Sequence, residues 1–454
     1  MNRTVRTLLM LTVAASLAGC GVFKGGKPKT PVLGNRVPVL VSESGVEVDP
    51  GLADVAVVLP PATVNPEWAQ PGGNASKSMG HLQLAANPSR VWSASIKGGT
   101  IRTRLAASPV VADGKLYVID TMAKVRAFNA QTGALLWTAQ VGDAADVAGG
   151  TSFWSGEMTG NSGLLYGGGV SVEGERVYAT SGLGDVVAMN AADGAVVWKK
   201  RPGGPLRGAP TLSGGNVYVV TQDNQLFALR GTDGNVEWSE AGTLETAGIF
   251  GVAAPAAAQG TVIAGFSSGE LNAYRYENGR VVWQDALSRT SISTSVSALS
   301  DIDADPVIDQ GRVYSVGKGG RMVALELVSG QRLWEINVAG IATPWAAGEW
   351  LFVVTDEGKL LCVARATGKV RWSTNVGRWH NEKKKKGPIN WTGPVLAGGQ
   401  LILANSRGDI AYVSPTTGAV LNTVEAKGSF YLPPIVADNM MFTLSSDGRL
   451  TAWR

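Results

Sequence analysis

The chain has 454 residues, a formal net charge of +4, 17% charged residues and two histidines. This near balance of charge argues against a nucleic-acid-binding protein, and His81 and His380 alone leave little for a metal site. The 59 glycines and 14 tryptophans indicate many short strands joined by tight turns.

The N-terminus has the pattern of a secreted lipoprotein. Arg3 and Arg6 precede a short apolar stretch at residues 8–17, which is too short to span a bilayer. The tetrapeptide at residues 17–20, Leu-Ala-Gly-Cys, resembles the bacterial lipobox, whose cysteine is lipidated and becomes the mature N-terminus. We therefore expect residues 1–19 to be a signal peptide and Cys20 to be lipidated. The alternative is an ordinary secretory signal with a cysteine at its end.

Residues 20–85 are rich in Pro and Gly and show no period, so we expect them to form a lipidated tether. The second cysteine, Cys362, lies in the apolar run at residues 360–364 and is interpreted as a small core residue. If Cys20 is acylated, no intramolecular disulfide is possible.

From about residue 86 the sequence repeats itself. Each copy has two short strands that are followed by a glycine and, four residues later, a tryptophan. These pairs are Gly133/Trp137, Gly194/Trp198, Gly234/Trp238, Gly279/Trp283, Gly330/Trp334 and Gly368/Trp372. A seventh copy has Gly418 but Asn422 in place of tryptophan, and an eighth begins at Met440 and stops at Trp453. One tryptophan per copy at a fixed distance from glycine predicts that these side chains dock one repeat against the next.

Most copies are preceded by a further strand headed by proline, so each unit holds four strands that form one antiparallel sheet. Radial stacking buries both faces of such sheets, whereas a solenoid is the competing arrangement. The isolated strand at residues 90–96 favours a ring, because it supplies the outer strand that the last copy lacks. We predict an all-β fold, an eight-bladed β-propeller at residues 86–454 with four-stranded antiparallel blades. The N-terminal strand with Trp92 closes the ring in the blade of residues 440–453.

The repeat resembles that of pyrroloquinoline-quinone (PQQ) dehydrogenase propellers over nearly all of residues 86–454. The lipobox and the acidic segment at residues 299–307, Leu-Ser-Asp-Ile-Asp-Ala-Asp-Pro-Val, make the chain resemble more closely the BamB family. That family consists of propeller lipoproteins of the outer-membrane β-barrel assembly machine. The resemblance implies a non-enzymatic scaffold without a cofactor, which binds a periplasmic domain of the barrel subunit BamA through loops on one face.

The resemblance also implies which residues contact that subunit. The matching positions are Asp301 and Asp303, together with Ile249 and Phe250 in the equivalent loop of the preceding blade. The family has a leucine followed by an arginine at the second loop, so Phe250 replaces a basic residue with an aromatic one. We expect the four residues to form one patch on a single face of the ring. Charged side chains in such loops rarely contribute to the hydrophobic core.

Three features have more than one interpretation. Asp301, Asp303 and Asp305 alternate, which suits calcium binding, local turn capping or a partner contact. The basic run Lys383–Lys386 is either a solvated hairpin tip or a contact for anionic lipid or an acidic protein. The loop at Phe153 and Trp154 is expected either to bind a partner or to plug the channel of the ring.

The function favoured by this resemblance is a scaffold subunit of the barrel-assembly machinery, lipid-anchored at the periplasmic face of the outer membrane. Its expected partners are a BamA-like barrel subunit and, by strand addition or through loops, unfolded outer-membrane proteins. The alternatives are a PQQ- or calcium-dependent dehydrogenase and another cell-envelope binding propeller. Adjacent cysteines, which such dehydrogenases carry over the quinone, are absent from the sequence.

Overall fold

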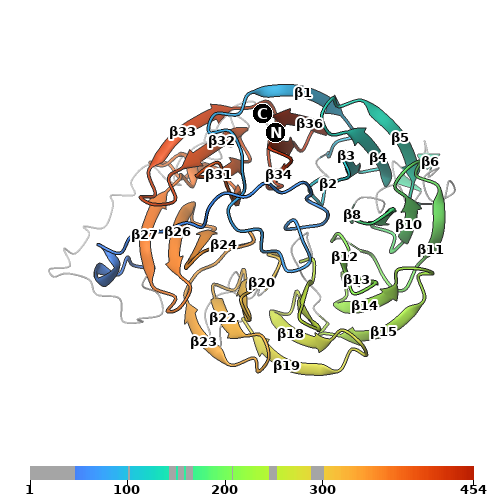
Figure 1. The fold of residues 1–454 in the computed structure, drawn as a ribbon, viewed down its shortest axis with the longest axis horizontal. Helices are drawn as coiled ribbons and strands as arrows, with labels where there is room; N and C mark the ends of the chain where they lie inside the picture. Colours follow the sequence, from blue (N-terminus) through green and yellow to red (C-terminus); the bar gives the residue numbers. More distant parts are fainter. Residues whose placement is uncertain are drawn as a thin grey trace, which may run out of the picture. The chain divides into compact units, whose positions relative to one another are not determined.

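Eight four-stranded antiparallel sheets are arranged around a central axis, which confirms the predicted eight-bladed propeller (Figure 1). The computed structural model describes residues 46–100, 103–142, 150–151, 158–159, 167–206, 208–244, 253–287 and 301–454. In each blade the first strand lies nearest the axis and the fourth strand forms the rim. None of the helical turns in these residues is long and apolar enough to cross a membrane.

The first four blades each consist of consecutive strands. Blade one is β2 (Val110–Ala112), β3 (Lys115–Ile119), β4 (Lys124–Asn129) and β5 (Leu135–Gln140); blade two is β8 (Val170–Glu173), β9 (Arg176–Thr180), β10 (Val186–Asn190) and β11 (Val196–Lys200); blade three is β12 (Thr211–Ser213), β13 (Asn216–Val220), β14 (Gln225–Arg230) and β15 (Val236–Ala241); blade four is β16 (Ala256–Ala258), β17 (Thr261–Gly265), β18 (Glu270–Arg275) and β19 (Val281–Ala286). A two-stranded hairpin, β6 (Gly150–Thr151) and β7 (Met158–Thr159), lies in the connection between blades one and two.

The next three blades follow the same order. Blade five is β20 (Val307–Asp309), β21 (Arg312–Val316), β22 (Met322–Glu326) and β23 (Arg332–Ile336); blade six is β24 (Trp345–Ala347), β25 (Trp350–Val354), β26 (Lys359–Ala364) and β27 (Val370–Asn375); blade seven is β30 (Trp391–Ala397), β31 (Gln400–Asn405), β32 (Asp409–Val413) and β33 (Val420–Glu425). A second small hairpin, β28 (Trp379–Asn381) and β29 (Lys386–Pro388), connects blades six and seven.

Blade eight closes the ring with strands from both ends of the described chain. Its inner strands are β34 (Ile435–Ala437), β35 (Met440–Leu444) and β36 (Arg449–Trp453), and its rim strand is β1 (Arg90–Ser95). Trp92 pairs with Ala452 across β1 and β36. The predicted closure by the N-terminal strand is therefore confirmed, and it removes two open sheet edges.

The tryptophan of one blade packs on a glycine of the next, as the repeat predicts. A β-carbon on Gly330 would lie 2.4 Å from Cγ of Trp283, and Gly330 has a φ of +70°, so only glycine fits this turn without strain. The indole N–H groups donate to backbone carbonyls of the same turns over 2.7 to 3.1 Å. The seven pairs are Trp92 on Gly133, Trp137 on Gly194, Trp198 on Gly234, Trp238 on Gly279, Trp283 on Gly330, Trp334 on Gly368 and Trp372 on Gly418.

Blade seven lacks this tryptophan, and the large and small residues of the pair have changed places between the third and fourth strands. In the other blades the residue paired with the tryptophan is small: Ala127, Ala188, Ala228, Ala273, Ala324, Cys362 or Ala452. In blade seven the tryptophan position holds Asn422 and its partner is Tyr412, which is 4% exposed. The aromatic ring has thus moved to the neighbouring strand. Because β36 and β1 come from opposite ends of the chain, no turn joins them on which a tryptophan at position 422 would dock.

Residues 46–85 do not form the free tether that their composition predicts. They run to the centre of the ring (Figure 1), where they contact the inner part of every blade. The contacts are Asn65 with Val436, Trp68 with Val111, Ala69 with Val172, Gln70 with Leu212, Ala75 with Ala257, Ser76 with Ile308, Gly80 with Trp345 and Leu82 with Leu396. All but one of these contacts satisfy a backbone group of the inner strands, which have no further strand beside them. The exception is Trp345, whose indole N–H donates to the carbonyl of Gly80. The compact unit accordingly begins at Gly45.

The two faces of the ring differ in what they carry. The chain runs outward through each blade and returns to the axis, so blade-to-blade connections and the turns between second and third strands share one face. We call this the loop face. The turns between the first and second strands lie on the opposite face. Residues 62–84 bind the ends of the inner strands at that face, for example at Gly398 and Asp438.

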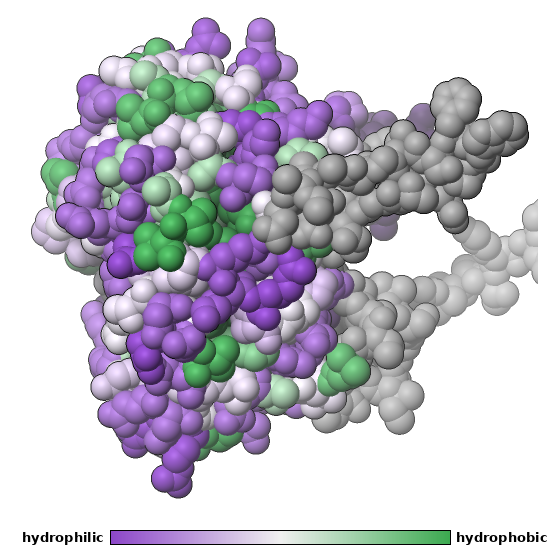
Figure 2. All heavy atoms as spheres, turned by 90° about the vertical axis from the view of Figure 1, so that its right-hand side faces the viewer, coloured by the Kyte–Doolittle hydropathy of each residue, from purple (hydrophilic) through white to green (hydrophobic). Residues whose placement is uncertain are grey.

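The rim itself carries scattered apolar side chains. Leu135, Leu136, Val196 and Val197 on β5 and β11 are between 40% and 56% exposed. On this side of the molecule Figure 2 shows small hydrophobic areas that are separated by hydrophilic atoms. Isolated apolar residues are ordinary on protein surfaces, so the rim does not stand out as a binding surface.

Candidate functional site

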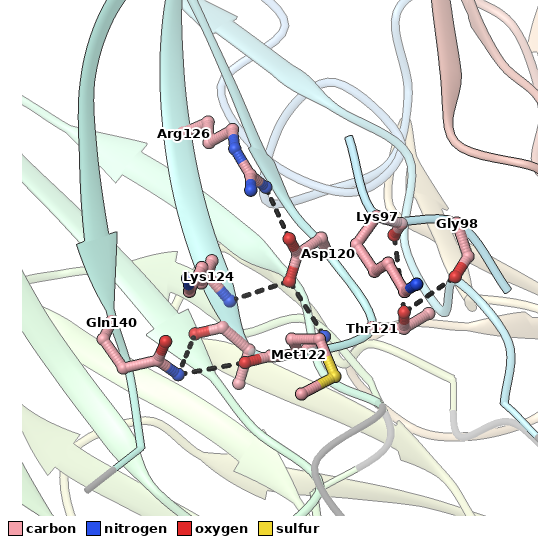
Figure 3. Close-up of polar contacts among 9 residues, drawn as sticks. Lys97, Gly98, Asp120, Thr121, Met122, Lys124, Arg126 and Gln140 are labelled. Carbon is pink, nitrogen blue, oxygen red and sulfur yellow. Dashed lines mark hydrogen bonds and ion pairs between the residues drawn. The ribbon is translucent and has the colours of Figure 1, made fainter. Parts of the chain in front are cut away.

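The loop face is held together by one contact that recurs from blade to blade. In blade one, Asp120 begins the turn between β3 and β4 and accepts from the N–H groups of Met122 (2.8 Å) and Lys124 (3.0 Å) (Figure 3). The next residue, Thr121, donates its hydroxyl to the carbonyl of Gly98 (2.8 Å), in the connection that enters the same blade (Figure 3). Arg126 pairs with Asp120 over 2.5 Å and stabilises the turn.

The same position of the turn donates its backbone N–H to the incoming connection in six blades. The pairs are Thr121 with Lys97, Gln222 with Pro205, Lys318 with Asp301, Asp356 with Ala339, Ser406 with Asn390 and Ser446 with Ser429. Asp301 therefore occupies a structural position of the repeat, and its carbonyl accepts from Lys318 over 2.8 Å. Sequence reasoning missed this role because the contact uses the backbone and leaves no residue pattern.

The acidic segment is irregular and lies between three blades. Ile302 fits against Gly265 of blade four, where a β-carbon would lie only 2.5 Å from its Cγ2 atom. Asp305 accepts from the N–H of Ala254 (2.7 Å), and its own N–H donates to Thr343 (3.1 Å). The segment is thus fixed rather than a loose loop. Residues 301–306 are not in a strand, so the alternation of the three aspartates in sequence does not place their side chains on one side.

Asp301 and Asp303 are less exposed than the surface patch predicted from the sequence requires. Asp301 is only 1% exposed, and Asp303 is partly buried. Burial, with a smaller contribution from the charge of Asp301, raises the pKa of Asp303 to about 7, although Lys318 acts in the opposite direction. The side chain of Lys318 pairs with Asp356 of blade six. The structure therefore brings both predicted aspartates together, but it buries Asp301 and places Asp303 in the wall of a cavity at the axis of the ring.

Asp303 and Asp305 line a cavity of about 250 Å³ on the loop-face side of residues 68–77. Trp68, stacked on Trp345 at 6.1 Å between ring centroids, and the buried Lys77 contribute to its wall. Burial lowers the pKa of Lys77 to about 8, opposed by the charge of Asp305, and burial raises the pKa of Asp305. The cavity lies at the axis of the ring and is lined mainly by apolar residues, with Lys77, Asp303 and Asp305 as its charged groups.

The remaining predicted site residues lie outside the described residues. These are Cys20, Ile249 and Phe250, together with the Phe153 and Trp154 loop. The described ends of the two predicted partner loops nevertheless touch, because Ala254 donates to Asp305. In the part of the chain that the structure describes, no three acidic, histidine or cysteine side chains form a group able to hold a metal ion. Cys362 is fully buried, as expected for a core residue.

The ring of eight PQQ-type repeats places the chain in a broad class of propellers that includes enzymes and binding proteins. The sequence profile of the family described as "Outer membrane protein assembly factor BamB" matches residues 79–145, 141–374 and 377–453. The chain belongs to this family.

Individual relatives agree over most of their length. The Outer membrane protein assembly factor BamB of Yersinia pestis is 27% identical over 369 residues, which is 81% of this chain and 89% of that protein. Its counterpart in Escherichia coli (strain K12) is 28% identical over 363 residues, 80% of this chain and 87% of that protein.

Solved structures show the same fold. The crystal structure of BamB from Moraxella catarrhalis superposes with a TM-score of 0.63 at 18% identity, covering 81% of this chain and 98% of its own. The quinohemoprotein alcohol dehydrogenase of Comamonas testosteroni gives a TM-score of 0.63 at 13% identity, covering 86% and 81%. At these identities the likeness is one of fold and does not distinguish the functions.

Proposed function

We propose that this protein is a non-enzymatic scaffold in the assembly of outer-membrane β-barrel proteins, and that it binds a periplasmic domain of a BamA-like subunit. The observation that carries this proposal is the family match, which extends over the whole ring. Relatives that align with about 80% of the chain bear the name of an outer-membrane assembly factor. A closed ring supports this role, because Asp305 in the connection into blade five is held by hydrogen bonds to two neighbouring blades and such a held surface loses little conformational entropy on binding.

The proposed partner site is the part of the loop face formed by the connections that enter blades four and five. Ile249 and Phe250 supply apolar surface for burial, and Asp303 supplies charge for orientation where the pH lies above its pKa of about 7. The bond between Ala254 and Asp305 supports the proximity of the two connections. Asp301 holds this connection in place, because its side chain is buried and its carbonyl accepts from the N–H of Lys318.

Binding of the purified periplasmic domains of the organism's BamA-like subunit tests the site. Ile249→Ala with Phe250→Ala is expected to weaken binding by at least tenfold, and Asp303→Asn by a few fold. High salt is expected to reduce the effect of Asp303→Asn but not that of the apolar pair, since screening leaves hydrophobic burial unchanged. An arginine at position 301 is avoided, because a buried position would not accept it without disturbing the fold.

Glu277→Gln is the matched control, because Glu277 is exposed on a turn at the opposite face of blade four. Equal binding by all variants would place the partner site elsewhere, with the Phe153 and Trp154 loop as the next candidate. An absorbance change when PQQ and calcium are added to the purified protein would instead favour the dehydrogenase alternative.

We further propose that Cys20 carries the lipid anchor at the periplasmic face of the outer membrane. The lipobox-like tetrapeptide and the family name support this location. The Cys20→Ala variant is expected to lose lipid labelling and to appear in the soluble periplasmic fraction. Wild-type protein that takes up no lipid label would exclude the anchor.

A further inference from the structure

A basic hairpin projects from the loop face between blades six and seven. It comprises residues 379–388, and we call it the lysine hairpin; β28 and β29 pair through Trp379 with Pro388 and through Asn381 with Lys386. All residues from His380 to Pro388 are exposed. The four lysines, Lys383–Lys386, occupy its turn and the start of β29.

The base of the lysine hairpin is firmly held, so the charges are presented at a defined place. The carboxylate of Glu382 accepts from the N–H groups of Arg378 and Trp379, each over 3.2 Å. Arg378 lies over the ring of Trp379 at 5.4 Å, and the indole of Trp391 donates to the carbonyl of Gly377 (2.7 Å). The single acidic residue of the hairpin therefore caps its own backbone at the base.

The side chains of the four lysines do not stabilise the fold. Within the described part of the chain, none of the four side chains makes a hydrogen bond or an ion pair. They form the longest run of consecutive basic residues in the sequence. The tip of the hairpin therefore carries a concentrated positive charge.

The lysine hairpin and the start of the described chain belong to the same blade. Val48 bridges Val370 at the beginning of β27, and Lys369 pairs with Asp49 (2.8 Å). The six residues of β27 span about 20 Å and lead directly into the hairpin. Blade six thus carries both the start of the described residues and the strand that leads into the lysine hairpin.

We propose that the lysine hairpin is a second membrane contact, which binds the phosphate groups of an anionic phospholipid surface. This inference rests on the proposed lipid anchor. Unpaired ammonium groups on a fixed stem suit phosphates that vary in position, because lysine binds them as point charges. Each lysine near an anionic surface strengthens binding about fivefold, so four lysines together supply a contact of considerable strength.

The test is flotation of the full chain with Cys20→Ala, so that no acyl group contributes, on vesicles of defined composition. We expect binding to vesicles rich in phosphatidylglycerol, little binding to phosphatidylcholine alone, and release by high salt. Replacement of Lys383–Lys386 by glutamine is expected to weaken binding at least tenfold, whereas replacement by arginine retains it. Because the four side chains bond to nothing, the melting temperature should not change.

The matched control replaces four exposed basic residues on other blades, Arg90, Lys97, Lys124 and Lys427, by glutamine. This control has the same net charge as the hairpin variant and is expected to float like the parent protein. Equal loss in both variants would attribute binding to overall charge and overturn the proposal, as would absent binding to anionic vesicles. Capture of the BamA-like domains by the hairpin variant is measured separately. If the hairpin variant still floats but no longer captures these domains, the hairpin contributes to the proposed partner site and the lipid contact is not supported by this variant.

Discussion

Trp92 and Ala452 face each other across the two strands that join the ends of the propeller. The indole N–H of Trp92 also donates to the carbonyl of Ala130 in blade one (3.0 Å), and its ring packs on Gly133. One side chain thus holds the closing blade to its own third strand and to the next blade.

Trp92→Ala is expected to lower the free energy of unfolding by about 3 kcal/mol, because it removes a large aromatic contact at the seam of the ring. Val91→Ala is the control, since Val91 lies in the same strand but is 48% exposed, and its effect should stay within about 0.5 kcal/mol. Urea denaturation of both variants measures the difference. Similar values for both would show that the seam does not depend on Trp92.

The second prediction concerns the inverted pair Tyr412 and Asn422 in blade seven. Tyr412→Ala is expected to cost about 3 kcal/mol, because it empties the volume that tryptophan fills in the other blades. Adding Asn422→Trp should restore only part of this loss, since no turn of blade eight offers the carbonyl that other tryptophans use. Denaturation of the single and double variants decides the point, and complete restoration would mean that another acceptor exists there.

The arrangement of the blades could be predicted from the sequence because every blade uses the same local contacts. Each tryptophan follows its glycine at a constant distance, so the docking of Trp283 on Gly330 has a visible counterpart in the repeat. The place of residues 46–85 could not be predicted. Their contacts involve eight different blades, one after another, and therefore leave no period in the sequence.

The candidate site was predictable only in part, for a related reason. The family resemblance located Asp301 and Asp303, but the burial of Asp301 follows from a backbone contact with Lys318 that any residue type can make. The same contact uses Lys97, Pro205 or Ala339 in other blades. An acidic residue at that position therefore does not reveal whether its side chain reaches solvent.

The third prediction concerns the pH dependence due to Asp303. Its pKa is raised from the ordinary value of 3.8 to about 7, so between pH 4 and 7 the folded protein binds a proton that the unfolded chain releases. Stability from this group is present below pH 4 and is lost as the pH rises to 7. Asp303→Asn should flatten this slope and raise the free energy of unfolding at pH 8. Glu277→Gln serves as the control in the same denaturation series and should leave the slope unchanged.

The last prediction concerns Lys77, which anchors residues 46–85 inside the ring. Lys77 is 2% exposed, and its ammonium group donates to the hydroxyl of Thr211 in blade three (3.0 Å). Its pKa falls from 10.5 to about 8 because burial disfavours the charge. Between pH 8 and 10.5 the unfolded chain therefore binds more protons than the folded protein, so this group makes stability rise with pH in that window.

The cost of burying the protonated lysine is fully present below pH 8 and amounts to about 3 kcal/mol, because a tenfold change in proton affinity corresponds to about 1.4 kcal/mol. Lys77→Met keeps the side-chain length and removes the charge, so the rise between pH 8 and 9.5 should disappear. The comparison stops at pH 9.5, since burial raises the pKa of Tyr117 and Tyr274 to about 12 and these groups lower stability above pH 10. Lys97→Met, at an exposed lysine, should keep the rise seen in the wild type. If Lys77→Met also keeps it, Lys77 is not buried in solution, and residues 46–85 do not occupy the centre of the ring as the structure shows.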